Sequence, residues 1–544
     1  MRDVENYGKS PLKNFAWCVC ILVGFALSCQ GVDSNDHGVP RIDEDAGDPD
    51  VQDHVVETNM GPIRGIEYPS SSAFLGIPYA EPPVAELRFA RPKPVKAWDG
   101  ELRAQNFGPP CPQLGRDTIS EDCLTLNIWA PASVGQSAPV MVWLHGGGLR
   151  SGSGDSEVAR GRFMAETTGT VVVSLNYRLG PFGFLAHPAF GETSGNYGLL
   201  DQQMALLWVR DNIAAFGGNP NNVTLMGESA GSASTCVQMT LPSSKGLFHR
   251  AILQSGPCAS LAPDGLSPVV TSEEAENQGK DLAEAVGCAY EADLVACLRS
   301  KSVDEILNAL PLVPTGIVVG PGVNWFPNID GEFLPDMPLS LIKEGKFHKV
   351  PTLIGTNGDE GTGFAAGADL IFMTGEDYVE RVRARFGALA EDVLASYPTF
   401  AWGMPFSTYS KLLGDMVFVC SSRQTARALA GMGVPTFLYS FDVVPSYAGP
   451  MSFLGAFHAA EIPFVFHSLP AQAEFTSDEE ELSKSMVKYW TNFARFGDPN
   501  SLGSTNWPLY DANEDRHLEF QLGSIEEGRN LSKDNCDFWD SIWP

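Results

Sequence analysis

One serine in this chain stands in a pattern that can turn a hydroxyl group into a nucleophile. Ser229 is the centre of Gly227-Glu-Ser-Ala-Gly231, in which small residues let a strand and a helix pass closely while the turn exposes the serine oxygen. Such a turn holds the serine in strained backbone geometry, as active sites often do. The five residues alone describe an ordinary loop equally well. An apolar run at 223–226 and a helix-compatible stretch at 232–239 favour the strand-turn-helix interpretation.

A glycine run supplies hydrogen-bond donors for the same chemistry. Residues 139–144 read as a buried strand that leads directly into His145-Gly-Gly-Gly148. Three consecutive glycines leave the backbone free to direct several N–H groups at one point, as stabilisation of an oxyanion requires. The run by itself also fits a flexible loop, but its position before the serine pattern favours the donor interpretation.

A nucleophilic serine also needs a base, and an acid that holds this base. Among nine histidines, His458 follows an apolar, turn-rich segment near the end of the chain. A single histidine is more often structural, so its assignment depends on its partners. Asp359 and Glu360 are adjacent, and spacing alone leaves either one as the acid. A base must be neutral, so kcat/KM should fall on the acid side near the reference histidine pKa of about 6.5.

The elements that must position these residues alternate between strands and helices. The predicted strands lie at 55–66 as a hairpin, and then at 121–129, 139–144, 171–175, 223–226, 251–254, 351–354 and 436–441. Helices are predicted at 199–216, at 232–239 and after a capping box of Ser477 with Glu480. This alternation indicates an α/β fold, with a large, mainly parallel central sheet and helices on both faces. With no interior linker, residues 54–544 are predicted to form a single domain.

The charge balance excludes one class of partner and defines the N-terminal region. The chain has 36 basic and 66 acidic residues, a net charge of -30, and nucleic-acid binding needs clusters of Lys and Arg. Nine acidic residues and one basic residue lie between Asp33 and Glu57. We therefore predict no nucleic-acid partner, and a flexible, solvated tether at 29–53.

Residues 1–28 have the features of a signal peptide. The apolar run at 15–27 follows three basic residues and is too short to span a bilayer as a helix. It ends in Ala26-Leu-Ser-Cys29, which resembles a bacterial lipoprotein box whose cysteine is acylated. Ala26 stands where Leu is usual, and secretion without a lipid is the alternative. We expect export, with attachment to a bacterial membrane through lipidated Cys29, or otherwise a periplasmic or secreted protein.

The cysteine count agrees with export. Cys18 and Cys20 leave with the signal peptide, and lipidation of Cys29 leaves eight of the eleven cysteines. An even remainder in an exported chain permits disulfides, although spacing does not give their pairing. No His/Cys cluster has the spacing of metal ligands, so we predict neither a metal nor a cofactor.

In this order, the segments resemble the carboxylesterase type B family, the cholinesterase-like branch of the α/β-hydrolases, from about Val55 to Trp543. The motifs that carry the resemblance are Phe74-Leu-Gly-Ile-Pro-Tyr-Ala80, Glu121-Asp-Cys-Leu-Thr-Leu-Asn127, His145-Gly-Gly-Gly148, Gly227-Glu-Ser-Ala-Gly231, Asp359-Glu-Gly361, Gly455-Ala-Phe-His458 and Cys536-Asp-Phe-Trp539. The chain departs from the family at Ala85, where Gly is usual, and at Leu149, where an aromatic residue is usual.

The resemblance implies an α/β-hydrolase fold and a serine carboxylic ester hydrolase that acts on small esters without a cofactor. Family positions, in the order serine, acid, histidine, imply a nucleophile, an acid and a base at Ser229, Glu360 and His458. They imply an oxyanion hole made by the N–H groups of Gly147, Gly148 and Ala230. The implied disulfides are Cys111–Cys123, Cys288–Cys297 and Cys420–Cys536, whereas Cys236 and Cys258 either pair with each other or stay reduced.

Three functional alternatives follow from the same resemblance. Some members of the family keep the fold as non-catalytic binding proteins, and a lipase or an amidase uses the same triad. In cholinesterases the loop closed by the first disulfide carries a tryptophan that binds the choline ammonium group. The loop from Cys111 to Cys123 contains no aromatic residue here, so we expect uncharged esters to be preferred over choline esters. The acyl chain length and the oligomeric state stay open.

Overall fold

The computed structural model describes residues 52–543, except 133–136, 192–193, 257, 259–268, 314–321 and 369. The predicted signal peptide, Cys29 and nearly all of the predicted tether lie outside the described residues. The first strand begins at Gln52, two residues before the predicted start of the domain. No helix among the described residues is long and apolar enough to cross a membrane.

One sheet of thirteen strands runs through the described part of the chain. Its strands are β1 (Gln52–Thr58), β2 (Gly61–Glu67), β3 (Ser71–Pro78), β4 (Leu102–Arg103), β5 (Thr125–Pro131), β6 (Ala138–Leu144), β7 (Val171–Leu175), β8 (Gly218–Glu228), β9 (Arg250–Gln254), β12 (Thr352–Asn357), β13 (Thr436–Phe441), β14 (Arg516–Gln521) and β15 (Ser524–Arg529). The strand order is β1-β2-β3-β5-β7-β6-β8-β9-β12-β13-β14-β15, with β4 beside β2. A separate pair joins β10 (Val270–Thr271) to β11 (Asn328–Ile329).

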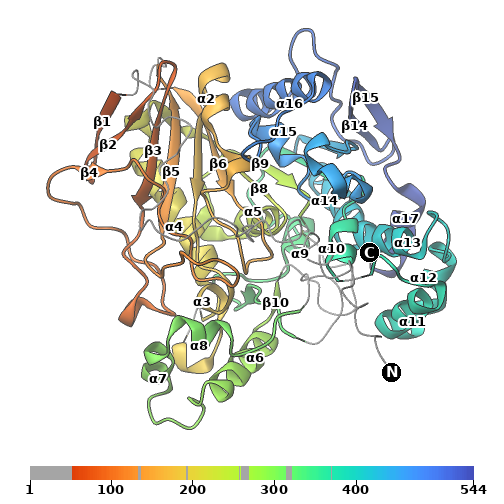
Figure 1. Ribbon diagram of the computed structural model, residues 1–544, viewed down its shortest axis with the longest axis horizontal. Coiled ribbons are helices and arrows are strands. Elements are labelled where there is room, and N and C mark those ends of the chain that lie inside the picture. The colour runs from red at the N-terminus through yellow and green to blue at the C-terminus, as the bar shows by residue number, and fades with distance from the viewer. Residues whose placement is uncertain are drawn as a thin grey trace, which may run out of the picture.

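The centre of the sheet is parallel, as predicted. Neighbouring strands from β7 through β6, β8, β9, β12 and β13 to β14 are all parallel, while both edges are antiparallel except for the short β4, which is parallel to β2. Figure 1 shows β6, β8 and β9 near the middle of the molecule. Because parallel strands end at the same edge, the loops after β6, β8 and β12 lie close together, where ligands bind in sheets of this kind.

Helices cover both faces of this sheet. Those among the described residues are α2 (Arg162–Thr168), α3 (Gly180–Phe184), α4 (Tyr197–Asn212), α5 (Ala230–Thr240), α6 (Ser272–Ala285), α7 (Leu294–Ser300), α8 (Val303–Leu307), α9 (Pro338–Lys343), α10 (Thr362–Gly367), α11 (Gly375–Phe386), α12 (Ala390–Ser396), α13 (Pro405–Gly414), α14 (Cys420–Gly431), α15 (Ile462–Phe466), α16 (Ser477–Phe496) and α17 (Lys533–Ile542). Alternate side chains of β6 enter two different cores. Val142 packs in the core that includes residues of α4 and α5, and Trp143 packs in the core that includes residues of α16.

The predicted capping box of α16 is wrong by one residue. Thr476, rather than Ser477, caps the helix, and its hydroxyl accepts a hydrogen bond from the backbone N–H of Glu479. The segment Thr-Ser-Asp-Glu-Glu fits the pattern in two registers. The Glu479 carboxylate also accepts a hydrogen bond from the backbone N–H of Ser446, and this tertiary contact favours the observed register.

Four disulfides link the described residues. They are Cys111–Cys123, Cys236–Cys258, Cys288–Cys297 and Cys420–Cys536. Cys236 and Cys258, for which the sequence left two possibilities, are therefore bonded to each other. The Cys420–Cys536 bond joins α14 to α17 across 116 residues, and closing a loop of this length is worth about 4 to 5 kcal/mol in the chain-entropy treatment.

Candidate active site

The turn between β8 and α5 holds Ser229 in a conformation that few serines adopt. Its backbone angles are φ 55° and ψ -122°, with the last residue of β8 before it and the first residue of α5 after it. A side chain at Gly227 would collide with the backbone of Gly231, and one at Gly231 would collide with the carbonyl of Leu144. The glycines therefore allow the close strand–helix approach that the pattern predicted.

The glycine loop lies directly against this turn. Leu144, the last residue of β6, pairs with Gly227 of β8, so the two loops leave neighbouring strands at the same edge. A Cβ atom on Gly146 would lie 3.0 Å from Ser229 Cβ. Gly147 and Gly148 have φ angles of 104° and 62°, which favour glycine. Among the residues that the structure describes, none accepts a hydrogen bond from either N–H group.

The N–H group of Ala230, the third proposed donor, is also available to an oxyanion, but for a different reason. Ala230 is the first residue of α5, and the first N–H groups of a helix have no partner within the helix. The positive end of the helix dipole also lies at this terminus and favours negative charge. The arrangement is therefore suited to stabilising an oxyanion beside Ser229.

His145 packs against Tyr177 and supports the glycine loop that follows it. Its imidazole stacks on Tyr177 with ring centroids 4.3 Å apart, and its Nδ1 lies 2.8 Å from the carbonyl oxygen of Gly146. The Tyr177 hydroxyl donates to the carbonyl oxygen of His145. Burial lowers the pKa of His145 to about 4, so the ring is neutral near pH 7 and adds no charge to the site.

The structure brings Glu360 and His458 together. His458 Nδ1 lies 2.6 Å from Glu360 Oε2, and the backbone N–H of Asn357 donates to Glu360 Oε1 over 2.7 Å. Asp359, which spacing left as an equal candidate, points elsewhere. Its Oδ2 accepts the N–H of Ala456, and its own N–H donates to the Ala456 carbonyl. Asp359 therefore fastens the loop that carries His458 and does not contact the imidazole.

The other imidazole nitrogen faces Glu228. His458 Nε2 lies 3.0 Å from Glu228 Oε1, and within the described ranges no hydrogen bond joins His458 to the Ser229 hydroxyl. Burial raises the pKa of the Glu228 carboxyl to about 8, while the charge of His458 acts in the opposite direction. Glu228 is the residue immediately before Ser229, at the end of β8.

The sequence interpretation missed Glu461, a third carboxylate close to the site. Glu461 is fully buried and accepts hydrogen bonds from Gln254 over 3.0 Å and from Asn357 over 2.7 Å. Burial and the nearby Glu360 charge raise its pKa. Its contacts with Gln254 and Asn357 join segments that are far apart in the chain, so no local sequence signal pointed to this residue.

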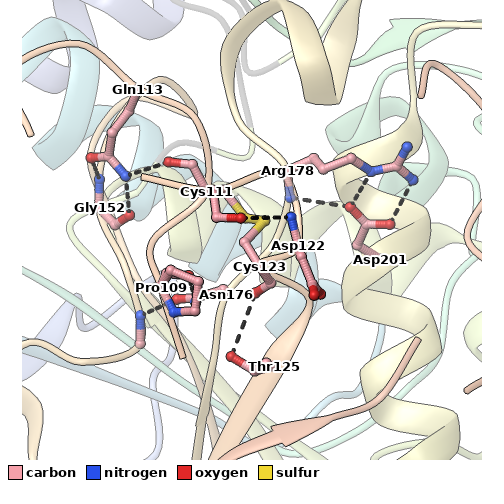
Figure 2. Close-up of a disulfide and its surroundings, with 12 residues drawn as sticks. Pro109, Cys111, Gln113, Asp122, Cys123, Thr125, Gly152, Asn176, Arg178 and Asp201 are labelled. Atoms are coloured by element: carbon pink, nitrogen blue, oxygen red, sulfur yellow. Dashed lines mark hydrogen bonds and ion pairs between the residues drawn. A yellow bond between two sulfur atoms is a disulfide. The ribbon is translucent and has the colours of Figure 1, made fainter. Parts of the chain in front are cut away.

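The first disulfide loop is tied to the segment that follows the glycine loop. Figure 2 shows the side-chain amide of Gln113 between Cys111 and Gly152. It accepts the N–H of Gly152 over 3.0 Å and donates to the Gly152 and Cys111 carbonyls. The loop therefore helps to hold the glycine loop in place, and it brings no aromatic ring to the site.

Comparison with known proteins identifies the class to which this fold and site belong. A family model described as the carboxylesterase family matches residues 52–539, so the chain belongs to that family and has its α/β-hydrolase fold. The chain is also 36% identical over 534 residues to the Mus musculus protein named cholinesterase, an alignment that covers 91% of this chain and 87% of that protein. Both findings support a carboxylic ester hydrolase with a small-molecule ester as its substrate.

Proposed function

We propose that the protein is a serine carboxylic ester hydrolase that works through an acyl-enzyme. The observation that carries the proposal is the convergence of the loops after β6, β8, β12 and β13 at one edge of the sheet. They present a strained serine, a glycine loop against it and a histidine held by a buried carboxylate. Ser229 is the proposed nucleophile, His458 the base and Glu360 the acid.

Acylation begins with a proton transfer. A serine hydroxyl is a poor nucleophile, so neutral His458 accepts its proton through Nε2 as Oγ attacks the ester carbonyl carbon. For this step the imidazole turns from Glu228 to Ser229. Glu360 keeps Nδ1 protonated and stabilises the imidazolium that forms.

Charge then develops on the carbonyl oxygen. The N–H groups of Gly147, Gly148 and Ala230 receive it, and removal of one such donor costs about 3 to 4 kcal/mol in other enzymes. His458 returns the proton to the leaving alcohol, which departs and leaves Ser229 acylated. Water then attacks the acyl-enzyme by the same route, with His458 again as the base, and this step releases the acid and restores the serine.

The direct test is turnover of p-nitrophenyl esters with acyl chains of increasing length by the purified protein. We expect release of p-nitrophenol, with kcat/KM that depends on the acyl chain. No turnover of any member by folded protein, judged by its circular dichroism, would contradict the proposal.

We also propose that the protein is exported. Its four disulfides are consistent with an oxidising compartment. Attachment to a membrane through a lipid on Cys29 is the finer proposal. Globomycin, which blocks processing of bacterial lipoproteins at this cysteine, tests it when the full chain is made in a bacterial cell.

The carboxylates around the His458 imidazole should shift the acid limb of the kcat/KM pH profile to higher pH. Burial acts to lower the pKa of His458, but the charges of Glu228 and Glu360 outweigh burial and raise it to about 9. A protonated imidazole is not a base, so kcat/KM should fall as the pH drops through a limb above the value of about 6.5 for an unperturbed histidine. Glu228→Gln removes one of these charges and should move the limb toward lower pH. A wild-type limb at or below the ordinary value, unchanged in the variant, would contradict this assignment.

Esters of an uncharged alcohol should have a kcat/KM at least as high as that of the matching choline esters. The loop from Cys111 to Cys123 lacks the expected tryptophan, and loss of a cation–π contact worth about 0.5 to 2 kcal/mol weakens choline-ester selectivity about two- to thirtyfold. Two other aromatic residues could take the place of this tryptophan, and of these Trp325 is buried whereas Phe326 is partly exposed. The measurement is kcat/KM for butyrylcholine against 3,3-dimethylbutyl butyrate, its neutral counterpart of the same shape. Faster turnover of the choline ester would show that another group binds the cation.

A further inference from the structure

An arginine lies beside the proposed oxyanion hole. The backbone N–H of Arg150 donates to the carbonyl oxygen of Gly147, which closes the turn that contains Gly148. The Arg150 side chain then folds back over this turn. Its Cγ and Nε both lie 3.8 Å from the point where a Cβ atom on Gly148 would stand. The guanidinium group therefore lies beside Gly148, a residue that we assign to the stabilisation of the reacting carbonyl.

Among the residues that the structure describes, this guanidinium pairs with no acidic side chain. Nη1 donates to the carbonyl oxygen of Val313 over 2.7 Å, and in the described part of the chain no carboxylate forms an ion pair with it. Arg178 and Arg423, which are buried elsewhere, pair with Asp201 and Asp515. Burial is what lowers the pKa of Arg150. An arginine nevertheless stays charged at any pH at which the protein functions.

Arg150 is partly buried, and a bound anion stabilises a partly buried cation that has no counter-ion. Within the described ranges only one of the guanidinium N–H groups has a protein acceptor, and the planar fork suits the two oxygens of a carboxylate. The net charge of -30 repels anionic molecules from the protein as a whole, so a favourable contact with an anion must come from a local cation.

We propose that Arg150 forms a subsite for a carboxylate carried by the ester substrate, close to the scissile bond. The inference rests on the proposed esterase function and narrows it. The preferred substrates are then esters of dicarboxylic acids, with the free carboxylate on the acyl part, or esters whose alcohol part carries the carboxylate. Arg150 also disfavours a choline group near this loop, because both are cations.

Two matched pairs of esters test the subsite. Mono-p-nitrophenyl adipate and p-nitrophenyl hexanoate differ by a carboxylate on the acyl chain. Para-acetoxybenzoate and its methyl ester differ by a carboxylate on the alcohol part. In the wild type we expect a higher kcat/KM for the anionic member of at least one pair. Arg150→Met keeps the apolar stem, and it should lower kcat/KM for that anionic member by about 10- to 100-fold while the neutral member changes less than about threefold.

Two further variants separate the subsite from a general charge effect. Arg150→Lys keeps the charge without the fork and should give an intermediate value. Arg210 is exposed, paired with Asp211 and located on α4, so Arg210→Gln should change the ratio within each pair by less than about twofold. The subsite proposal would be overturned if Arg150→Met lowered kcat/KM equally for both members of a pair. It would also be overturned if the wild type showed no preference for the anionic member of either pair. If neutral esters are not hydrolysed either, the esterase proposal fails first.

Discussion

Ser229→Ala should reduce kcat for neutral p-nitrophenyl esters by about 10⁴- to 10⁶-fold, because no acyl-enzyme can form without the nucleophile. The substitution removes one oxygen atom from a strained turn, so the fold should persist. The glycine loop and the helix N-terminus remain, and they leave a residual rate above that in water. The measurement compares kcat of the variant and the wild type with the same ester.

Covalent labelling gives this prediction a second readout. An organophosphate should add one equivalent to Ser229, abolish turnover in proportion and leave Ser229→Ala unlabelled. Mass spectrometry of the digested protein identifies the labelled residue. Label on a different residue, or a fully active variant, would show that another group is the nucleophile.

Glu360→Gln should lower kcat by about 10³- to 10⁴-fold, because an amide neither holds the correct imidazole tautomer nor stabilises the imidazolium. The geometry that carries this prediction is the 2.6 Å contact between Glu360 Oε2 and His458 Nδ1. The side chain keeps its size, and Asn357 N–H still has an oxygen to which it can donate. The loss should therefore appear in kcat rather than in the melting temperature.

Asp359→Asn is the matched control, because it changes the neighbouring carboxylate in the same way. Asp359 Oδ2 accepts the Ala456 N–H, and a weakened bond here should cost about 1 to 3 kcal/mol of stability with less than about a tenfold loss of kcat. Measuring kcat and the melting temperature for both variants separates the two roles. A larger loss of kcat in Asp359→Asn than in Glu360→Gln would reverse the assignment.

The central strands were predictable from the amino-acid sequence alone. The runs predicted at 171–175 and 436–441 are strands with those bounds, because a strand buried on both faces is mainly apolar and ends where turn residues begin. The serine turn was also predictable, since its glycines satisfy a steric condition that is local in the chain. The register of the α16 cap was not, because two registers fit the local pattern and a contact with Ser446 favours one of them.

The contacts between charged groups depend on the three-dimensional fold and could not be predicted from the sequence. Asp359 and Glu360 are neighbours in sequence, but the loop between β12 and α10 points one at Ala456 and the other at His458. The contact of Glu228 with His458 and the burial of Glu461 depend on elements far apart in the chain. The same holds for Arg150, which forms no ion pair with any of the carboxylates that the structure describes. Electrostatic energy depends on the distance between charges and on their burial, and the local spacing of residues in the sequence determines neither quantity.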